Sequence, residues 1–272
     1  MNIFYINLEK QVLRRDAIEK LFLDINPQGW ALRRFNAVNT EDVENSNILG
    51  SLSPAAKACF LSHRGVIEAN LGDQQHICVL EDDATFSVET FGVIDAIVGS
   101  IQGDWDILYL DICVPTIRDM LFLYELKQKL NESNQQQLLN LQEVFYASAA
   151  AYIINGKSKK KVFDLLKKHD HLDVAVDIAY RSLVHQRALN AFVFFPFLSS
   201  LAKDSESSDI QEKKDFYTEV VWHSFRKLMW IGGSPEDCRK NLDILSKGEF
   251  TPEAEAFSII LKGFLSTDYQ VK

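Results

Sequence analysis

The sequence ICVLEDDATF, at residues 77–86, joins a short apolar run to three consecutive acids. The run ICVL has the composition of a buried strand, and Glu81, Asp82 and Asp83 follow it directly. Three adjacent carboxylates repel one another, so their position at the end of a core strand needs an explanation. Ligands of open α/β sheets bind beyond the carboxyl ends of the strands. The stretch therefore predicts either a solvated acidic turn or a site for a divalent cation and, with it, a phosphate group.

On both sides of this stretch, predicted strands and helices alternate. The predicted strands are residues 2–8, 30–38, 77–80, 105–110, 144–154 and 191–195, and the predicted helices between them are 9–23, 53–71, 87–100, 156–168 and 173–189. Residues 40–51 are predicted to be a loop, and residues 116–142 a helical insertion or cover. Strands that alternate with helices predict an α/β fold with a mostly parallel sheet flanked by helices.

The last quarter of the chain has a different pattern. Residues 216–231, 235–246 and 252–266 are all predicted to be helical, and a polar loop at 203–214 precedes them. The chain is therefore divided into an α/β domain at 1–212 and a C-terminal all-helical appendage at 213–272. The aromatic residues Trp222, Phe225 and Trp230 are expected in its core or at an interface, so a homodimer through these helices is one option.

Composition narrows the class of protein. The chain has 272 residues, of which 47% are hydrophobic and 25% charged, as in soluble globular proteins. Its net charge of −9 argues against a general nucleic-acid binder. Four scattered cysteines indicate free thiols in a reducing compartment. With no signal-peptide pattern and no run of ~18 to 20 apolar residues, we expect a cytoplasmic protein. The lysine-rich stretch 157–168 is either a solvated helix face or a contact with an anionic acceptor or the inner face of a membrane.

The three acids allow two chemical interpretations. Glu81 to Thr85 is close to the signature DxDx[TV] of haloacid-dehalogenase phosphatases, but a glutamate in the nucleophile's place would shift the attacking oxygen by about 1 Å, which costs on the order of 100-fold. In the other interpretation, the carboxylates hold Mn²⁺ or Mg²⁺ for a nucleotide sugar, and the cation neutralises the departing diphosphate. Alternation along extended chain then directs Glu81 and Asp83 to one side and Asp82 to another.

Three blocks of sequence, in order, resemble a known family. They are Ile6-Asn7-Leu8 with Arg14-Arg15, then CFLSHR at 59–64, then VLEDD at 79–83. In this order and spacing they resemble glycosyltransferase family 25, the lipooligosaccharide and collagen galactosyltransferases. Residues 105–108, 146–154 and 205–210 resemble its later blocks. Ala58 stands where the family usually has glycine, and the resemblance does not extend to residues 216–272.

The resemblance implies a GT-A-like, Rossmann-type fold and an inverting transfer of a hexose, galactose by analogy, from a UDP-sugar to a bacterial surface glycan. It assigns the metal to Asp83 with Glu81, and the donor to Asn7, Arg14, Ser62, His63 and Glu81. Each assignment has a structural alternative: Asn7 could stabilise a turn, one of the adjacent arginines must point away because they are 100° apart on a helix, and His63 could be a hydrogen-bonded core residue that orients the acids.

An inverting transfer also needs a base that takes the proton of the acceptor hydroxyl. Asp173 and Asp177 share a helix face, and Asp173 is predicted to be the N-cap. Asp177 would then lie one turn inside the helix, where the resemblance places a family aspartate, and it is the first candidate. Asp111, after the predicted strand 105–110, is the second. The alternative function is a catalytically inactive family member that binds a nucleotide sugar or recruits a partner enzyme.

Overall fold

The computed structural model describes residues 1–25, 27–133, 135–202, 216–241 and 251–266. Its centre is a seven-stranded sheet in the order β2-β1-β3-β7-β5-β8-β6. The strands are β1 (Asn2–Asn7), β2 (Ala31–Asn36), β3 (Ile77–Glu81), β5 (Ile107–Tyr109), β6 (Gln137–Asn140), β7 (Ala151–Ile154) and β8 (Ala191–Phe195). β1 is parallel to β2 and β3, and β5 is parallel to β8, whereas β7 and β6 are antiparallel to their neighbours. The predicted mostly parallel sheet is confirmed.

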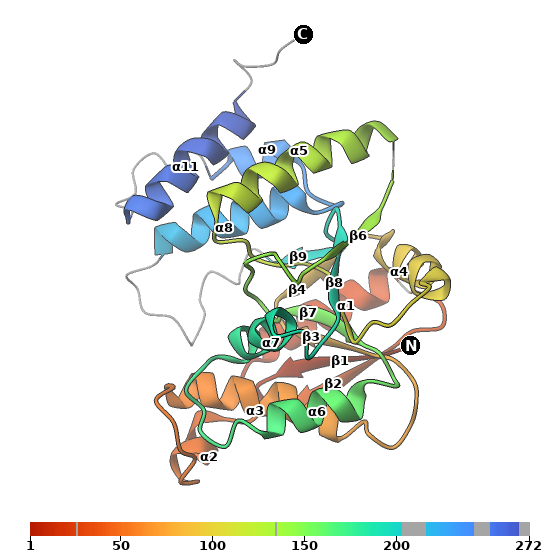
Figure 1. Ribbon diagram of the computed structural model, residues 1–272, viewed down its shortest axis with the longest axis vertical. Coiled ribbons are helices and arrows are strands. Elements are labelled where there is room, and N and C mark those ends of the chain that lie inside the picture. The colour runs from red at the N-terminus through yellow and green to blue at the C-terminus, as the bar shows by residue number, and fades with distance from the viewer. Residues whose placement is uncertain (26, 134, 203–215, 242–250, 267–272) are drawn as a thin grey trace.

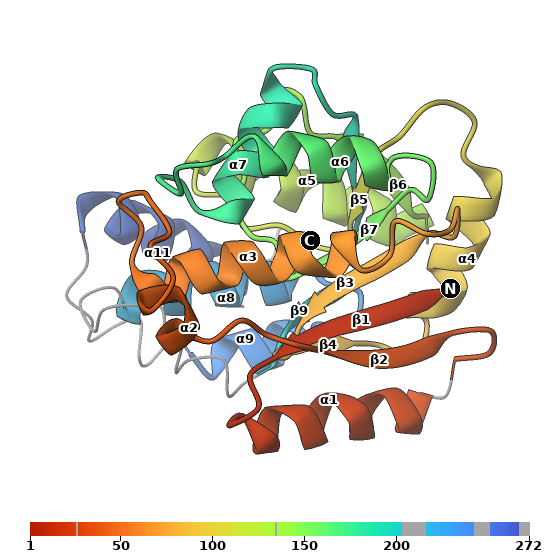
Figure 2. The ribbon, with the colours of Figure 1, turned by 90° about the horizontal axis from the view of Figure 1, so that it is seen from below.

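Side-chain alternation along the strands divides the core into two layers. Ile77 and Val79 of β3 pack into one hydrophobic cluster, and Cys78 and Leu80 into the other. The first cluster includes side chains of α3 (Pro54–Glu68), α6 (Lys159–Lys167) and α7 (Val176–His185); the second includes side chains of α1 (Val12–Ile25) and α4 (Thr90–Ser100). Figure 2 shows α1 and α3 on opposite sides of β1 and β2. Helices thus cover both faces of the sheet.

The C-terminal helices gather at one end of the molecule (Figure 1). They are α8 (Phe216–Met229), α9 (Pro235–Arg239) and α11 (Pro252–Leu265), and α5 (Ile117–Ser133) packs against α8. Lys127 of α5 donates to the carbonyl oxygens of Leu228 and, at 3.0 Å, Trp230. Phe225 and Leu261 belong to the same hydrophobic cluster as the central strands. The predicted boundary at 212/213 lies outside the described residues.

Several short elements were not predicted. The 40–51 segment contains α2 (Thr40–Glu44), whose N-cap Asn39 accepts a hydrogen bond from the Asp42 amide at 2.7 Å. A second sheet pairs β4 (Ala84–Phe86) with β9 (Ser199–Leu201), so β8 is not the last strand, and β6 lies inside the predicted helical insertion. Strands of three or four residues are too short to show a periodic pattern.

Three of the six lysines in the lysine-rich segment form ion pairs with described residues of the chain. Lys159 is only 1% exposed and lies 2.7 Å from Asp73, so it is not part of a solvated face. Lys161 lies 2.7 Å from Asp106, and Lys160 pairs with Asp164. These pairs leave less free positive charge for an anionic partner than the sequence indicates. None of the helices in the described part of the chain has both the length and the hydrophobicity that crossing a bilayer requires.

Candidate functional site

A cavity of about 600 Å³ opens at the carboxyl ends of β1, β2 and β3. Its walls come from the segments that follow these strands and from α3. The predicted site residues among its lining are Arg14, Ser62, His63, Glu81 and Asp83. Asn7 lies between the lining residues Ile6 and Leu8. The place is the one expected for a ligand of an open α/β sheet.

Helix α3 presents a narrow stripe to this cavity. Ser53 caps the helix by accepting a hydrogen bond from the Ala56 amide at 3.2 Å, and Pro54 occupies the first turn. Ala55, Ala58 and Ser62 have the three- and four-residue spacing of one helix face, Cys59 lies beside Ala58, and all four line the cavity. Ser62 Oγ accepts from the Val38 amide at 2.9 Å and donates to the Ala58 carbonyl at 2.7 Å. Ser62 therefore fixes the β2–α2 loop against α3.

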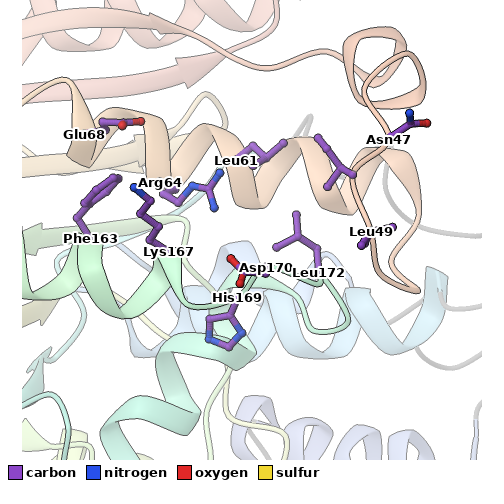
Figure 3. A pocket seen from close by; sticks show the side chains of 11 residues that line it. Asn47, Leu49, Leu61, Arg64, Glu68, Phe163, Lys167, His169, Asp170 and Leu172 are labelled. Carbon is purple, nitrogen blue, oxygen red and sulfur yellow. The ribbon is translucent and has the colours of Figure 1, made fainter.

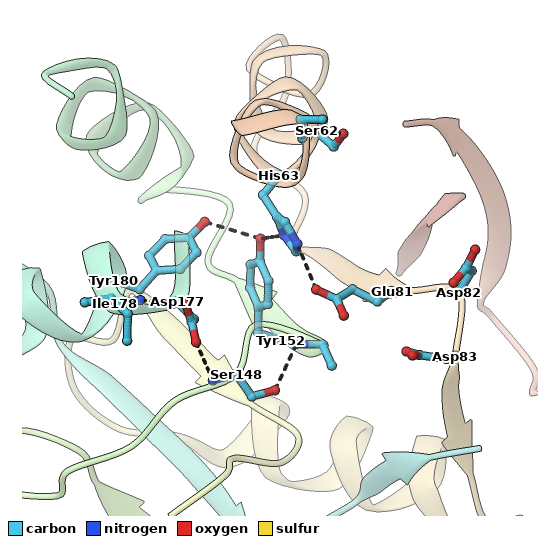
Figure 4. A network of polar contacts seen from close by, with 12 residues as sticks. Ser62, His63, Glu81, Asp82, Asp83, Ser148, Tyr152, Asp177, Ile178 and Tyr180 are labelled. Atoms are coloured by element: carbon cyan, nitrogen blue, oxygen red, sulfur yellow. Dashed lines mark hydrogen bonds and ion pairs between the residues drawn. The ribbon is translucent and has the colours of Figure 1, made fainter. Parts of the chain in front are cut away.

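The three acids at the end of β3 are held differently. In Figure 4 the side chains of Glu81 and Asp83 extend to one side and that of Asp82 to another. Asp82 nevertheless borders the cavity, and it accepts hydrogen bonds from Asn7 Nδ2 at 2.7 Å and Arg14 Nη1 at 3.2 Å. Arg14 Nη1 also lies 3.8 Å from Asp83 Oδ2. Arg14 thus offsets part of the negative charge of Asp82 and Asp83.

The amide of Asn7 is fully engaged inside the protein. Besides Asp82, its Nδ2 contacts the Gln11 carbonyl at 3.0 Å, and its Oδ1 accepts from Arg34 Nε at 2.9 Å. Of the two alternatives for Asn7, the structure shows the hydrogen bonds that stabilise the β1–α1 turn. Arg15 lies 3.7 Å from Asp16 and is not among the cavity's lining residues, so one arginine of the pair faces the site, as helix geometry predicts.

His63 connects the acids to two buried tyrosines (Figure 4). Its Nε2 lies 3.3 Å from Glu81 Oε1, and its Nδ1 lies 2.9 Å from the Tyr152 hydroxyl, which is 3.3 Å from the Tyr180 hydroxyl. An ionised carboxylate can only accept, so Nε2 donates to Glu81. In the neutral ring, Nδ1 then accepts from Tyr152. His63 is both a fully buried core residue and the group that orients Glu81.

In the acidic turn, which is residues 81–83, the pKa values of Glu81 and Asp83 are shifted in opposite directions. Burial opposes the ionisation of Glu81, but the hydrogen bond from His63 and the charges of Arg226 and Arg14 hold its pKa below the ordinary value. For Asp83, burial and the neighbouring Glu81 charge raise the pKa to about 7. Within the described residues, Asp83 Oδ1 is buried without a hydrogen-bond partner. A repelled pair of carboxylates with one orphaned oxygen fits a hard divalent cation, which prefers oxygen ligands.

A second group of metal-binding side chains overlaps with this pair. Ligand atoms of Cys59, His63 and Glu81 lie within 4.8 Å of one another. Such a nitrogen, sulfur and oxygen set is of the kind that zinc takes. Both ring nitrogens of His63 already have partners in Glu81 and Tyr152, however, so this group is complete without an ion. The orphaned oxygen of Asp83 favours the oxygen site.

The two candidate bases lie outside the lining of the cavity. Asp177 is in the first turn of α7, which begins at Val176, and not one turn inside the helix as predicted. Its Oδ2 accepts from the Ser148 amide at 3.0 Å and its Oδ1 from the Ile178 amide at 2.9 Å. Asp173, the predicted N-cap, lies outside the helix and accepts from the Ser51 amide at 2.7 Å. The N-cap residue is Ala175, so the predicted cap was wrong.

Asp111 is 1% exposed and forms an ion pair with Arg226 of α8. The sequence predicted neither this pair nor the contacts of Ser148, Tyr152 and Tyr180. In the sequence, the four-residue spacing that places Cys59 and His63 on one helix face was the signal that could have indicated the buried side of the site. The two tyrosines lie in apolar segments that are typical of a hydrophobic core. Arg226 lies in a helix whose sequence has no recognisable motif.

A separate cavity of about 430 Å³ lies against another face of α3. Leu61, Arg64 and Glu68 line it from α3, and Phe163 and Lys167 from α6 (Figure 3). None of the predicted site residues borders it. The acidic turn and the predicted donor residues Arg14, Ser62 and His63 therefore line the larger of these two cavities.

The geometry can be set beside known proteins. In structural comparison, the chain is similar to the apo-form glycosyltransferase GlyE of Streptococcus pneumoniae TIGR4, with 10% identity, a TM-score of 0.38 and coverage of 70% of this chain and 44% of that one. It is also similar to mouse xyloside xylosyltransferase 1, with 11% identity, a TM-score of 0.39 and coverage of 69% and 70%. The matched region thus spans less than half the length of the S. pneumoniae enzyme, and both similarities are remote.

Sequence comparisons give a firmer result. No protein of curated function matches the chain. The sequence pattern of the family described as glycosyltransferase family 25 (LPS biosynthesis protein) matches residues 1–180, which include β1 to β3, the acidic turn and the beginning of α7. The chain belongs to glycosyltransferase family 25.

Proposed function

We propose that this glycosyltransferase moves a hexose, galactose by family analogy, from a UDP-sugar to a glycan acceptor in the synthesis of lipooligosaccharide or another bacterial surface polysaccharide, with inversion at the anomeric carbon. The observation that carries the proposal is the acidic turn. Glu81 and Asp83 border a 600 Å³ cavity at the carboxyl ends of three parallel strands, and Asp83 keeps an orphaned buried oxygen. A diphosphate with its cation is the ligand chemistry that this arrangement fits best.

In this proposal Asp83 and Glu81 hold Mn²⁺ or Mg²⁺, which would supply a counter-charge to the diphosphate leaving group. His63 keeps Glu81 ionised and pointed into the cavity through its Nε2–H. Arg14 offsets part of the negative charge on Asp82 and Asp83, so that the turn does not repel an anionic donor outright. The protein's part is to hold these groups in place before the donor arrives, which is where most electrostatic catalysis originates.

We assign Asp177 as the base that accepts the proton of the acceptor hydroxyl. Each of its carboxylate oxygens accepts a single backbone N–H, which fixes the group while leaving lone pairs available. Its backbone link to the site is short: Ser148, which donates to Asp177, is two residues from Ala150, whose carbonyl accepts the Glu81 amide at 2.8 Å. Asp111 is less suited, because its carboxylate is already paired with Arg226.

The test is UDP release from UDP-sugars, measured with and without Mn²⁺ and with and without a lipooligosaccharide acceptor. We expect slow UDP release without acceptor, faster release with it, and loss of both on chelation. Donor sugars are compared in the same assay. Binding of UDP without any release from any UDP-sugar would support the alternative of a catalytically inactive scaffold. Membrane association and a homodimer through the C-terminal helices remain predictions that sedimentation with and without vesicles would address.

A further inference from the structure

We propose that Arg226, on helix α8 of the C-terminal region, is a positioning residue of the active site: it braces the Ser148 segment that supports both Asp177 and the acidic turn. The inference rests on the function proposed above. It gives the C-terminal helices a part in the reaction, although the family match ends at residue 180 and α8 begins at Phe216.

The contacts form a continuous path from α8 to the proposed base. Arg226 is 4% exposed, and its Nη2 contacts both Asp111 Oδ1 and, at 3.0 Å, Ser148 Oγ. The Ser148 amide then donates to Asp177 Oδ2 at 3.0 Å. One residue, Ser148, therefore separates the guanidinium from the proposed base.

The same segment supports the acidic turn. Ser148 Oγ also accepts from the Ala150 amide at 3.3 Å, and the Ala150 carbonyl accepts from the Glu81 amide at 2.8 Å. A displacement of Ser148 would therefore shift the positions of both Asp177 and Glu81.

The backbone of Ser148 explains why a brace is needed. Its φ angle is +90°, in a region that non-glycine residues seldom adopt. Such conformations persist only where the surroundings enforce them, and they collect at functional sites. Here the enforcing contacts are the Arg226 hydrogen bond to Oγ and the Asp177 hydrogen bond to the amide.

The chemistry of the Arg226–Asp111 pair also favours a functional role. Both side chains are almost completely buried, and replacing such a pair with apolar groups of similar volume is often neutral or stabilising. Packing of α8 alone therefore gives no reason for an arginine here. A planar guanidinium that can contact a carboxylate and a hydroxyl at once does give one.

The experiment uses three variants of the full chain. Arg226→Met/Asp111→Leu removes the pair without leaving a buried charge. Ser148→Gly keeps the positive φ accessible and removes the hydroxymethyl side chain, including the Oγ that Arg226 contacts. Lys127→Met is the matched control, because Lys127 is also a buried cation bound to the C-terminal region, through the Leu228 and Trp230 carbonyls, and does not touch Ser148. The readouts are the melting temperature, the Kd of UDP with Mn²⁺, and kcat and KM of sugar transfer.

We expect Arg226→Met/Asp111→Leu to fold, with kcat reduced on the order of 100-fold, the cost of a misplacement of about 1 Å. The affinity for UDP with Mn²⁺ should fall by less than kcat, because Glu81 and Asp83 keep their contacts with His63 and Arg14. Ser148→Gly should also lower kcat, and adding it to the double variant should cause little further loss, because both changes break one path. Lys127→Met should change the melting temperature and leave kcat of the folded enzyme unchanged.

An unchanged kcat in the folded double variant would overturn the inference, and so would an equal loss of kcat in Lys127→Met. Fully additive losses of kcat when Ser148→Gly is combined with the double variant would also overturn it, because they would indicate that Asp111 acts independently. Failure of the proposed function would show separately, as a wild type that neither binds UDP nor releases it from UDP-sugars. In that event, hydrogen exchange of the Ser148 amide still tests whether Arg226 holds the Ser148 segment in place. Faster exchange in the double variant is expected, and unchanged protection would contradict the inference.

Discussion

The two sides of this site are built in different ways. The cavity side consists of segments that follow β1, β2 and β3 and one stripe of α3, and all of its lining residues come from residues 6–83. The support side consists of Asp111, Ser148, Asp177 and Arg226, which are distant in sequence; the first two lie in loops, and the others lie in α7 and α8. The cavity side follows from the topology of the sheet. On the support side, the pairing of β5 with β7 brings Asp111 near Ser148, but α7 and α8 are joined to Ser148 by side-chain hydrogen bonds.

The difference assigns different tasks to the two sides. The cavity side has the charge, the volume and the orphaned oxygen that donor binding needs. The support side has the proposed base and its fixed geometry. Changes on the cavity side should therefore weaken donor binding, and changes on the support side should slow the transfer itself. Variants on each side test this division, and the largest change in free energy is expected at Asp177.

Asp177→Asn should have the largest effect on the transfer step. Loss of a positioned base costs about 10²- to 10⁴-fold in rate, so kcat should fall by that amount while the Kd of UDP stays unchanged. Asp173→Asn is the control, since Asp173 is exposed, lies four residues away and can keep its contact with the Ser51 amide as asparagine. An Asp177→Asn enzyme with wild-type kcat would move the base elsewhere.

Arg226→Met alone should unfold more easily than the Arg226→Met/Asp111→Leu double variant. The single change leaves Asp111 charged and buried, which typically costs about 3–5 kcal/mol, and the second change removes that charge. Urea denaturation measures both free energies of unfolding. If the single variant were as stable as the wild type, the Asp111–Arg226 pair would not be a desolvated ion pair.

His63→Gln should weaken metal-dependent donor binding through Glu81. Groups that orient a metal ligand typically contribute about 10- to 100-fold, so kcat/KM should fall within that range. Tyr180→Phe removes only the last hydroxyl of the His63–Tyr152–Tyr180 path and should have a much smaller effect. Equal losses in the two variants would mean that the tyrosines, and not Glu81, depend on His63.

A matched pair of helix caps tests whether the two regions unfold together. Ser53 caps α3 and Thr251 caps α11, each followed by proline and each accepting from a backbone amide three residues on. Replacing either with alanine should cost about 1 kcal/mol. One shared thermal transition that shifts equally in both variants is expected, because both helices pack into the same hydrophobic cluster. A separate transition that moves only with Thr251→Ala would support an independent domain at 213–272.

The sequence was informative where chemistry and local pattern coincide. The helix predicted at 53–71 and the buried strand predicted before the three acids are both present, as α3 and β3. Period-two alternation in β3 also predicted that Glu81 and Asp83 share a direction, as Figure 4 shows. These features depend on residues that are neighbours in the sequence, so they can be predicted from a single sequence.

Long-range contacts were not accessible in the same way. Nothing in the pattern of α8 indicates that Arg226 meets Asp111 and Ser148, more than 70 residues away in sequence. Asp173 was predicted as the N-cap because aspartate favours that position, but its carboxylate instead binds the Ser51 amide, and α7 begins three residues later. Tertiary hydrogen bonds outweighed local preference at both places.

The central claim is that the acidic turn binds the donor through a metal ion. Isothermal titration of UDP in the presence and absence of Mn²⁺, for the wild type and for Asp83→Asn, tests it most directly, since Asp83→Asn keeps the shape of the side chain. We predict Mn²⁺-dependent binding by the wild type and its loss in Asp83→Asn, with the melting temperature preserved. Equal affinity of the two proteins for UDP in Mn²⁺ would contradict the claim.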